Sequence, residues 1–349
     1  MTRSELAAVA ALLLVVIGLP VTILGYQFGL RPGLAEVRTI DIVAAAPEAG
    51  GFQPDSIRVA AGETVRLRFS VPDVTHGLAI GPGLGLDFGQ VDPGEVKEVE
   101  VTFEEAGRYT LYCNTWCSPS HWRMRSTIQV IDPANPDAPP SSGGPDPVLE
   151  SLAERQVDID APHPAAVPAE PPSPVRGGAV VASLGDDLPA ELLDERWRRS
   201  HSPVEAQQML AAQGVTEAEA WDAVASLWLV DLTPDDRRVA AELYAKNCAA
   251  CHGENGDGFG PGADVLAAHQ AEHPGEMAMN MATAPTAFDD PSTMLGGSGD
   301  IYYAKLRRGG MGTSMPSFGQ LFTPAETWQL VDYLWTFVFE PPNGPTSEQ

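Results

Sequence analysis

The sequence contains four cysteines, and they occur as two close pairs. The second pair lies in Cys248-Ala249-Ala250-Cys251-His252, which has the C-x-x-C-H spacing of c-type haem attachment. Two thiols at this spacing can add to the two vinyl groups of a haem, and the adjacent histidine then lies under the iron. A zinc site or a redox disulfide would also use C-x-x-C, but neither requires the histidine that follows. We therefore expect a covalently bound haem c, attached through Cys248 and Cys251, with His252 as an iron ligand.

The sixth iron ligand should lie well downstream of this motif. Residues 309–318 include Met315-Pro316 and resemble the distal-methionine loop of class I cytochromes c. This resemblance indicates Met315 as the ligand, with Met311 as the alternative. A histidine and a methionine together leave no open coordination position, so such a haem should carry electrons and not bind oxygen. The other downstream candidates are His269, His273, Met277, Met279, Met281 and Met294.

The first cysteine pair lies between Cys113 and Met124, in a segment that reads C-x3-C-x3-H-x2-M, and His76 lies 37 residues upstream of Cys113. Thiolate, imidazole and thioether ligands together are typical of copper. A blue site with one copper uses a single cysteine, whereas two cysteines four residues apart can bridge two coppers. Zinc seldom binds methionine, and a copper-delivery protein would need a thioredoxin-like βαβ pattern, which this region lacks. We therefore expect a binuclear copper centre.

The elements that must position these ligands differ between the two motifs. Residues 36–132 contain short alternating polar and apolar runs, such as 64–69 and 96–103, broken by glycine and proline. This pattern predicts an antiparallel β-sandwich. Residues 231–349 predict an all-α cytochrome c domain, with a helix at 235–247 and a closing helix that begins at the Thr323-Pro324-Ala325-Glu326 cap and runs to about 339.

The remaining segments carry no metal-binding motif. Residues 1–35 contain an uncharged run from Leu6 to Leu30, long enough for a single transmembrane anchor; a cleaved signal peptide is the alternative. Residues 133–185 predict an extended proline-rich linker, because 12 of the 44 residues from 133 to 176 are proline. Residues 186–230 predict helices of unknown role at 190–199, 203–213 and 216–228, the last with a Thr216/Glu219 capping box.

The charge of the 349-residue chain limits its partners. A formal net charge of −26 excludes nucleic acid as the main partner, because phosphate binding needs a basic surface. An acidic surface favours basic partners and salt-sensitive encounters. The alternative is a solvated surface that only maintains solubility.

Residues 51–132 resemble the periplasmic copper domain of cytochrome c oxidase subunit II, in particular the ba3-like form with one transmembrane helix. The shared stretches are Phe52-Gln53-Pro54-Asp55, Pro72-Asp73-Val74-Thr75-His76-Gly77, Asp92-Pro93-Gly94-Glu95-Val96 and the cysteine loop itself. The haem domain after them resembles the cytochrome c fusion of caa3-like oxidases. The resemblance implies a cupredoxin fold with the CuA ligands His76, Cys113, Cys117, His121, Met124 and the backbone carbonyl of Thr115. Relatives commonly have glutamate at Thr115, where it can bind a non-redox metal, so that extra metal is in doubt here.

The resemblance further implies a subunit II that accepts electrons for a haem-copper terminal oxidase. Electrons would pass from a donor to haem c, to binuclear CuA, and to a haem in subunit I, where oxygen is reduced to water. The alternatives are the CuA-containing subunit of a nitric oxide reductase and a free-standing membrane-anchored electron carrier. Trp116 and Trp122 could line an electron path or pack the loop.

Because haem attachment by this motif takes place outside the cytoplasm, we expect a bacterial inner-membrane protein with a cytoplasmic N-terminus and periplasmic domains. Its expected partners are oxidase subunit I, other oxidase subunits, and a cytochrome or copper-protein donor with a basic docking face.

Overall fold

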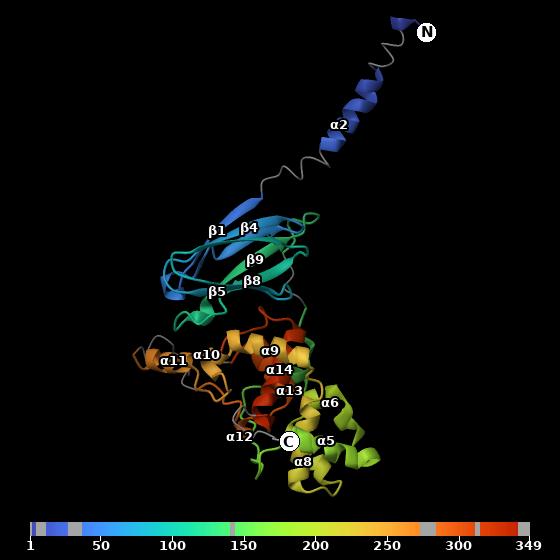
Figure 1. Ribbon diagram of the computed structural model, residues 1–349, viewed down its shortest axis with the longest axis vertical. Helices are drawn as coiled ribbons and strands as arrows, with labels where there is room; N and C mark the ends of the chain where they lie inside the picture. The colour runs from blue at the N-terminus through green and yellow to red at the C-terminus, as the bar shows by residue number, and fades with distance from the viewer. Residues whose placement is uncertain are drawn as a thin grey trace.

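The computed structural model describes residues 2–4, 12–26, 37–139, 144–272, 284–310 and 315–340. Figure 1 shows a β-sandwich stacked on a larger helical unit, with the N-terminal helix α2 apart from both. The sandwich lies within residues 38–131, and the helical unit lies within residues 147–339.

The sandwich consists of a four-stranded sheet, in the order β2-β1-β4-β7, and a five-stranded sheet, in the order β3-β9-β8-β5-β6. Alternation along β4 shows why it forms: Val65, Leu67 and Phe69 are fully buried, whereas Arg66 pairs with Glu100 on the outer face at 2.7 Å. The strands are β1 (Arg38–Ala44), β2 (Phe52–Gln53), β3 (Ser56–Ala60), β4 (Thr64–Ser70), β5 (His76–Gly81), β6 (Leu86–Val91), β7 (Val96–Thr102), β8 (Gly107–Tyr112) and β9 (Arg125–Ile131).

The predicted all-β sandwich is confirmed, but it is not purely antiparallel. β1 pairs with β4 in parallel, and β3 pairs with β9 in parallel. The reason is that the chain changes sheets between β2 and β3, so strands distant in sequence become neighbours and run in the same direction. Period-two alternation reports which residues face the core, and it carries no information on strand direction.

The haem-motif region forms the C-terminal part of the helical unit, and three of its helices begin at residues whose side chains cap them, Thr233, Asp290 and Thr323. The side chain of Thr323 accepts a hydrogen bond from the Glu326 backbone, and the Glu326 side chain accepts one from the Thr323 backbone, which confirms the predicted capping box. The helices of this region are α9 (Pro234–Asn247), α10 (Ala249–His252), α11 (Pro261–Glu272), α12 (Pro291–Met294), α13 (Gly299–Arg308) and α14 (Pro324–Phe339). The predicted helices at 235–247 and 324–339 are therefore confirmed within one residue.

Residues 186–230 are helical as predicted, but the single helix predicted at 190–199 is divided at Asp194 into a 3-10 turn and a six-residue helix. The Thr216/Glu219 capping box is present at the start of α8 (Glu217–Leu229). The preceding elements are the 3-10 turns η5 (Gly185–Asp187) and η6 (Ala190–Leu193), then α6 (Glu195–Ser200) and α7 (Pro203–Ala211). Buried side chains of α8 share one hydrophobic core with α14 of the cytochrome-like region. These helices are thus part of the unit that carries the haem motif.

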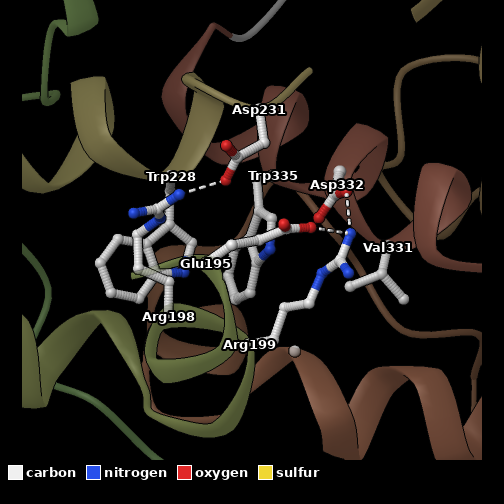
Figure 2. A pocket seen from close by; sticks show the side chains of 9 residues that line it. Glu195, Arg198, Arg199, Trp228, Asp231, Val331, Asp332 and Trp335 are labelled. Atoms are coloured by element: carbon white, nitrogen blue, oxygen red, sulfur yellow. Dashed lines mark hydrogen bonds and ion pairs between the residues drawn. The ribbon is translucent and has the colours of Figure 1, made fainter. Parts of the chain in front are cut away.

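A cluster of charged side chains fixes α6 against α14, as Figure 2 shows. Arg199 of α6 pairs with Asp332 of α14 at 3.2 Å, and Arg198 pairs with Asp231. Burial raises the pKa of Asp332 to about 6, although the Arg199 charge opposes this shift. The cavity among these residues measures about 20 Å³, which leaves space for little more than a water molecule.

The extended linker predicted for residues 133–185 differs from what the structure shows. This segment contains α4 (Pro147–Glu154) and α5 (Pro174–Leu184), and each helix has proline at its first position. Asp146 caps α4 and also accepts hydrogen bonds from Tyr303 and Arg307 of α13, at 2.9 and 3.0 Å. Two of the prolines, Pro147 and Pro174, therefore start helices that pack on the helical unit, and the described part of the segment does not form a free tether.

The N-terminal region shows a π-helical turn, η1 (Leu14–Gly18), followed by α2 (Leu19–Gly25), and its large apolar side chains are exposed. Among the residues that the structure describes, no helix is both long and apolar enough to span a membrane. The predicted anchor at 6–30 extends into residues 5–11 and 27–36, which lie outside the described part of the chain.

The two units meet along the end of the sandwich that carries the cysteine loop. Lys246 of α9 pairs with Asp87 of β6 at 2.7 Å. Gly81, at the end of β5, lies so close to the Leu321 backbone that a Cβ at this position would lie 2.1 Å from its carbonyl oxygen. Ala79 and Tyr112 of the sandwich belong to the hydrophobic core of the helical unit. Polar and apolar contacts therefore join the units directly.

Candidate metal centres

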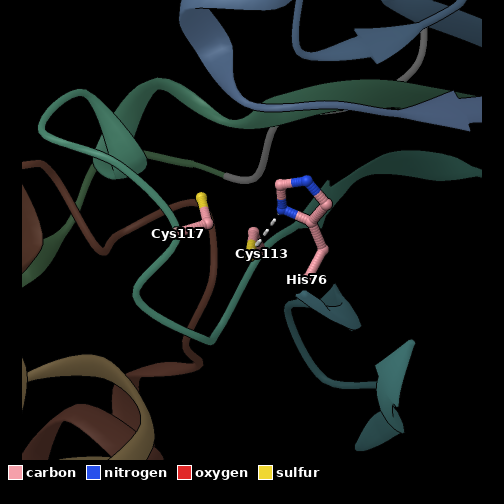
Figure 3. Close-up of side chains that lie close together, drawn as sticks. All are labelled: His76, Cys113 and Cys117. Carbon is pink, nitrogen blue, oxygen red and sulfur yellow. Dashed lines mark hydrogen bonds between the residues drawn. The ribbon is translucent and has the colours of Figure 1, made fainter. Parts of the chain in front are cut away.

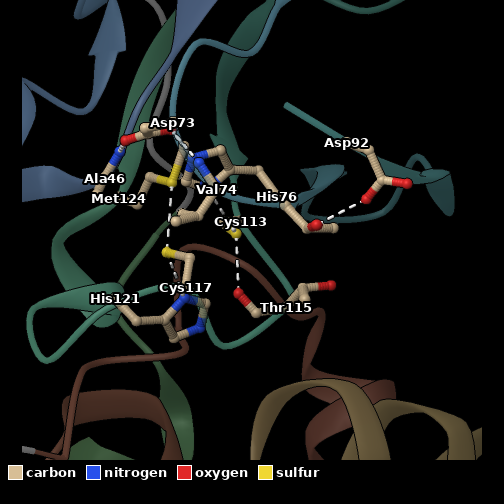
Figure 4. Close-up of polar contacts among 11 residues, drawn as sticks. Ala46, Asp73, Val74, His76, Asp92, Cys113, Thr115, Cys117, His121 and Met124 are labelled. Atoms are coloured by element: carbon tan, nitrogen blue, oxygen red, sulfur yellow. Dashed lines mark hydrogen bonds and ion pairs between the residues drawn. The ribbon is translucent and has the colours of Figure 1, made fainter. Parts of the chain in front are cut away.

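The six copper ligands predicted from the sequence come from one strand start and one loop. His76 is the first residue of β5, and Cys113 directly follows β8. The loop from Cys113 to Met124 then leads through a short 3-10 turn, η4 (His121–Arg123), into β9. Figure 3 shows Cys113 and Cys117 beside His76, and Figure 4 shows His121, Met124 and Thr115 around the same thiols.

The potential ligand atoms are close enough to surround metal. The thiol of Cys113 lies 3.8 Å from His76 Nδ1 and 3.1 Å from the Thr115 carbonyl oxygen. The Cys117 thiol lies 3.5 Å from His121 Nδ1 and 3.9 Å from Met124 Sδ. Ligand atoms of His76, Cys113 and Cys117 all lie within 4.8 Å of one another. The structure thus brings all six predicted ligands together, and their binding of copper remains a prediction.

The electrostatics of the site favour one deprotonated thiol even without metal. A hydrogen bond from Cys117, aided by His121 and His76, lowers the pKa of Cys113 to about 3 against the opposing effect of burial. The same shared proton raises the pKa of Cys117. Thiolate is the form that binds metal. Because the fold already favours the thiolate of Cys113, metal binding would require less free energy for deprotonation of this thiol.

Asp73 orients the His76 ring through the nitrogen that faces away from the thiols. Its Oδ1 lies 2.9 Å from His76 Nε2, which leaves Nδ1 directed at the thiols. Burial opposes protonation of His76, but hydrogen bonds with Cys113 and Asp73 outweigh it and raise the pKa of the imidazole. A carboxylate behind a ligand histidine is a common feature of metal sites, because it fixes the ring and its tautomer.

The haem motif lines a cavity of about 730 Å³, which is large enough for a cofactor of haem size. Cys248, Cys251, His252 and Met315 all line this cavity, together with the apolar side chains of Phe288, Leu306, Leu330 and Leu334. None of the four cysteines is in a disulfide. Thiols, an imidazole, a thioether and an apolar wall are the environment that a covalently attached haem requires, so the residues present fit this group.

The surroundings of His252 fit its predicted role as an iron ligand. Its Nδ1 lies 3.0 Å from the Thr286 carbonyl oxygen, to which it can donate, so Nε2 remains available for iron. The ring stacks on Phe288 at 4.5 Å between centroids. Burial lowers the pKa of His252, which favours the neutral, ligating imidazole.

The structure places only some of the methionines and histidines considered for the sixth position. Met315 lines the cavity, whereas Met294 is fully buried in the helical core and is not among the lining residues. Met311, His273 and Met277 to Met281 lie outside the described residues, and the side chain of His269 is not described either. Of the candidates that the structure describes, Met315 is therefore the one that lines the cavity of the haem motif, and its role as iron ligand remains a prediction.

The same cavity extends from the haem motif to the copper loop. Tyr112, Trp116, Trp122 and Arg125 of the sandwich line it, beside the potential ligands Cys113, His121 and Met124. The ring of Trp116 lies 5.7 Å from that of His121, and a Cβ built on Gly262 of α11 would lie 2.9 Å from Trp116 Cζ3. Trp116 therefore contacts both units, whereas the sequence left it open whether this residue lines a path or packs the loop.

Arg125 is a residue of this cavity that the sequence did not single out. Its Nη1 donates a hydrogen bond to the Ser317 carbonyl oxygen at 2.8 Å. Burial lowers the pKa of Arg125 to about 10, so the guanidinium remains charged at neutral pH. The only signal in the sequence was its position next to Met124, which says nothing of a contact 192 residues away.

Comparisons with known proteins found relatives for the helical region with the haem motif and for the sandwich with the cysteine loop. The cytochrome c family model matches residues 239–337. Cytochrome c oxidase subunit 2 of Thermus thermophilus is 37% identical over 83 residues, which is 24% of this chain and 59% of that protein. The chain thus joins a segment homologous to cytochrome c oxidase subunit 2 to a cytochrome c domain. A second cytochrome c oxidase subunit 2 of the same species matches with the same identity over 48% of its length, so the chain spans only about half the length of these relatives.

Two solved structures are also similar in part. One is described as a heme-copper terminal oxidase dimer; it is 20% identical with a TM-score of 0.24, and the match covers 37% of this chain and 99% of the other. The periplasmic domain of subunit II of cytochrome oxidase from Bradyrhizobium japonicum is 19% identical with a TM-score of 0.24, over 29% of this chain and 90% of the other.

Proposed function

We propose that this chain is the subunit that accepts electrons for a haem-copper terminal oxidase. A donor would reduce a haem c held by Cys248, Cys251, His252 and Met315. Electrons would then pass to a binuclear copper centre and on to a haem in a separate subunit that reduces oxygen to water. The observation that carries this proposal is that the four potential haem-binding residues and three of the six potential copper ligands, Cys113, His121 and Met124, line one cavity between the two units.

The residues of the chain have distinct roles in this proposal. The thiols of Cys113 and Cys117 would hold the copper, together with His76, His121, Met124 and the Thr115 carbonyl. Bound copper would supply a centre that changes charge by one electron with little rearrangement, because the fold already holds the ligands together. Asp73 would keep His76 oriented through the cycle. The apolar wall around His252 would exclude water from the haem and so favour its reduced state.

The proposal places the copper and haem units outside the cytoplasm, with the N-terminal apolar run as a membrane anchor. Cytochrome c oxidase subunit 2 of Thermus thermophilus is similar to this chain over the copper-type segment, which supports an oxidase as the assembly. We place the oxygen-reducing site in a separate subunit, because a haem held by His252 and Met315 would have no open position for oxygen.

The experiment is metal analysis and electron paramagnetic resonance of the purified full chain. We expect two coppers and one iron per chain, and a spectrum in which one unpaired electron is shared between two coppers. Cys117→Ser should abolish that copper signal and leave the haem spectrum intact, whereas Cys251→Ala should impair haem attachment and leave the copper signal.

A single copper with an ordinary mononuclear spectrum would contradict the binuclear centre. Membranes from which the chain purifies without any haem-copper partner would contradict the role as an oxidase subunit and favour a free-standing carrier. A partner complex that reduces nitric oxide in place of oxygen would identify the other enzyme class.

A further inference from the structure

Arg125 joins the two loops that carry the two potential thioether ligands. It directly follows Met124 in the chain and is the first residue of β9. Its Nη1 donates to the carbonyl oxygen of Ser317 at 2.8 Å, and Ser317 is only two residues beyond Met315. One side-chain hydrogen bond thus connects the copper loop of the sandwich with the distal-methionine loop of the helical unit.

The charge of Arg125 is unusual in its setting. The side chain is half-buried and lines the cavity shared by the two centres. Arg307 and Arg308 of the helical unit each pair with an aspartate, Asp146 and Asp160. In contrast, no carboxylate pairs with Arg125 among the residues that the structure describes. Arg125 is therefore a cation without a counter-charge in this part of the chain, held between the two sets of ligands.

Such a cation has two physical consequences. A buried positive charge stabilises the state of a nearby metal centre that carries one electron more, because the interaction is weakly screened in a low dielectric. A planar guanidinium with several donors in a fixed geometry also restrains two backbones more firmly than a flexible ammonium can. The first consequence depends on charge alone, and the second depends on the hydrogen bond, so they can be separated by substitution.

We propose, on the basis of the function proposed above, that Arg125 is a positioning residue that couples the two redox centres. Its hydrogen bond to Ser317 holds the haem loop against the copper loop, and its charge raises the electron affinity of the haem. In the step that the hydrogen bond supports, one electron leaves the reduced haem iron and enters the oxidised copper centre. No bond forms or breaks in that step, and no proton moves.

Three variants of the full chain separate these roles. Arg125→Met removes the charge and the hydrogen bond and retains much of the apolar stem. Arg125→Lys retains the charge and loses the planar donor. Arg123→Gln is the matched control, because Arg123 flanks Met124 on its other side, is exposed, and lies over the Trp122 ring at 4.7 Å.

Two measurements are made on each variant: the haem midpoint potential by optical titration, and the rate of haem-to-copper electron transfer after photoreduction. For Arg125→Met we expect haem-to-copper electron transfer to be at least tenfold slower. The equilibrium constant for reduction of the haem should fall tenfold, which corresponds to a decrease of about 59 mV in its midpoint potential. Arg125→Lys should restore the potential but not the rate. Arg123→Gln should change neither, because solvent screens its charge.

The outcomes distinguish this role from the proposed function. A wild-type chain that transfers electrons, with Arg125→Met equal to it in both rate and potential, would overturn the role of Arg125 alone. A wild-type chain that binds neither haem nor copper would overturn the proposed function as well. Metal content and the methionine-to-iron charge-transfer absorption show whether each variant is folded and holds its metals. If Arg125→Met is not folded, Arg125→Lys provides the test. An electron-transfer rate in Arg125→Lys equal to that of the wild type would then overturn the proposed role of the hydrogen bond.

Discussion

Replacing Gly81 by alanine should push the two units apart. Gly81 ends β5 in the sandwich, and a Cβ at this position would lie 2.1 Å from the backbone oxygen of Leu321 in the helical unit. Both atoms belong to backbone-fixed positions, so neither can rotate away and the clash must be relieved by separation of the units. Overpacking of this kind typically costs about 1 to 3 kcal/mol.

The assay is thermal unfolding of the full chain, followed by the photoreduction experiment. At about 2–4 °C per kcal/mol for units of this size, the Tm of the interface-dependent transition should fall by about 2 to 12 °C. The sandwich and the helical unit should then unfold in two separate transitions. Haem-to-copper transfer should also slow, because the two sets of ligands lie farther apart.

Gly85→Ala is the matched control. Gly85 lies close by in the sandwich with a φ of 59°, and a Cβ there would meet no atom within 4 Å. Alanine at Gly85 should therefore strain the sandwich by about 1 to 2 kcal/mol without separating the units. If Gly81→Ala unfolds as the wild type does and transfers electrons at the wild-type rate, the docked arrangement of the units is wrong.

Three further substitutions test other parts of the structure. Asp73→Asn weakens the support of His76, and we expect a loss of about 10–100-fold in copper affinity, measured by competition with a chelator, while the haem spectrum is unchanged. Asp332 has a raised pKa of about 6, so the folded state holds its proton more tightly than the unfolded state does. Its contribution to stability should therefore rise by about 2 kcal/mol as the pH falls from 7 through 6 toward 4, and Asp332→Asn should abolish this dependence in urea titrations; an equal slope in both proteins would contradict it. Asp146→Ala removes the cap of α4 and leaves Arg307 without its ion-pair partner, so it should cost about 2 to 4 kcal/mol in urea unfolding and speed proteolysis of residues 147–154. Unchanged proteolysis would mean that this segment is not held on the helical unit.

The sequence predicted the parts of the molecule whose signals are local. The cysteine loop places five potential copper ligands within residues 113–124, and the haem motif places three functional residues within 248–252. Helix caps such as Thr323/Glu326 are also local, because the partners lie within one turn. His76 is the exception, because it lies 37 residues upstream of the loop and the sequence still singled it out as part of the copper ligand set.

The parts that could not be predicted depend on contacts between distant segments. The hydrogen bond from Arg125 to Ser317 joins residues 192 positions apart, and no periodicity in either segment indicates it. The proline-rich composition of 133–185 suggested an extended chain, but composition does not reveal that Pro147 and Pro174 stand at helix starts. The parallel pairing of β1 with β4 likewise follows from a change of sheet that alternation cannot report.

The most direct test of the central claim is the concentration dependence of haem-to-copper electron transfer in the purified full chain. If the chain holds both centres in the shared cavity, photoreduction of the haem should be followed by first-order reduction of the copper, with a rate constant independent of protein concentration. A rate that rises in proportion to protein concentration, or a transfer that requires an added carrier, would contradict an intramolecular path.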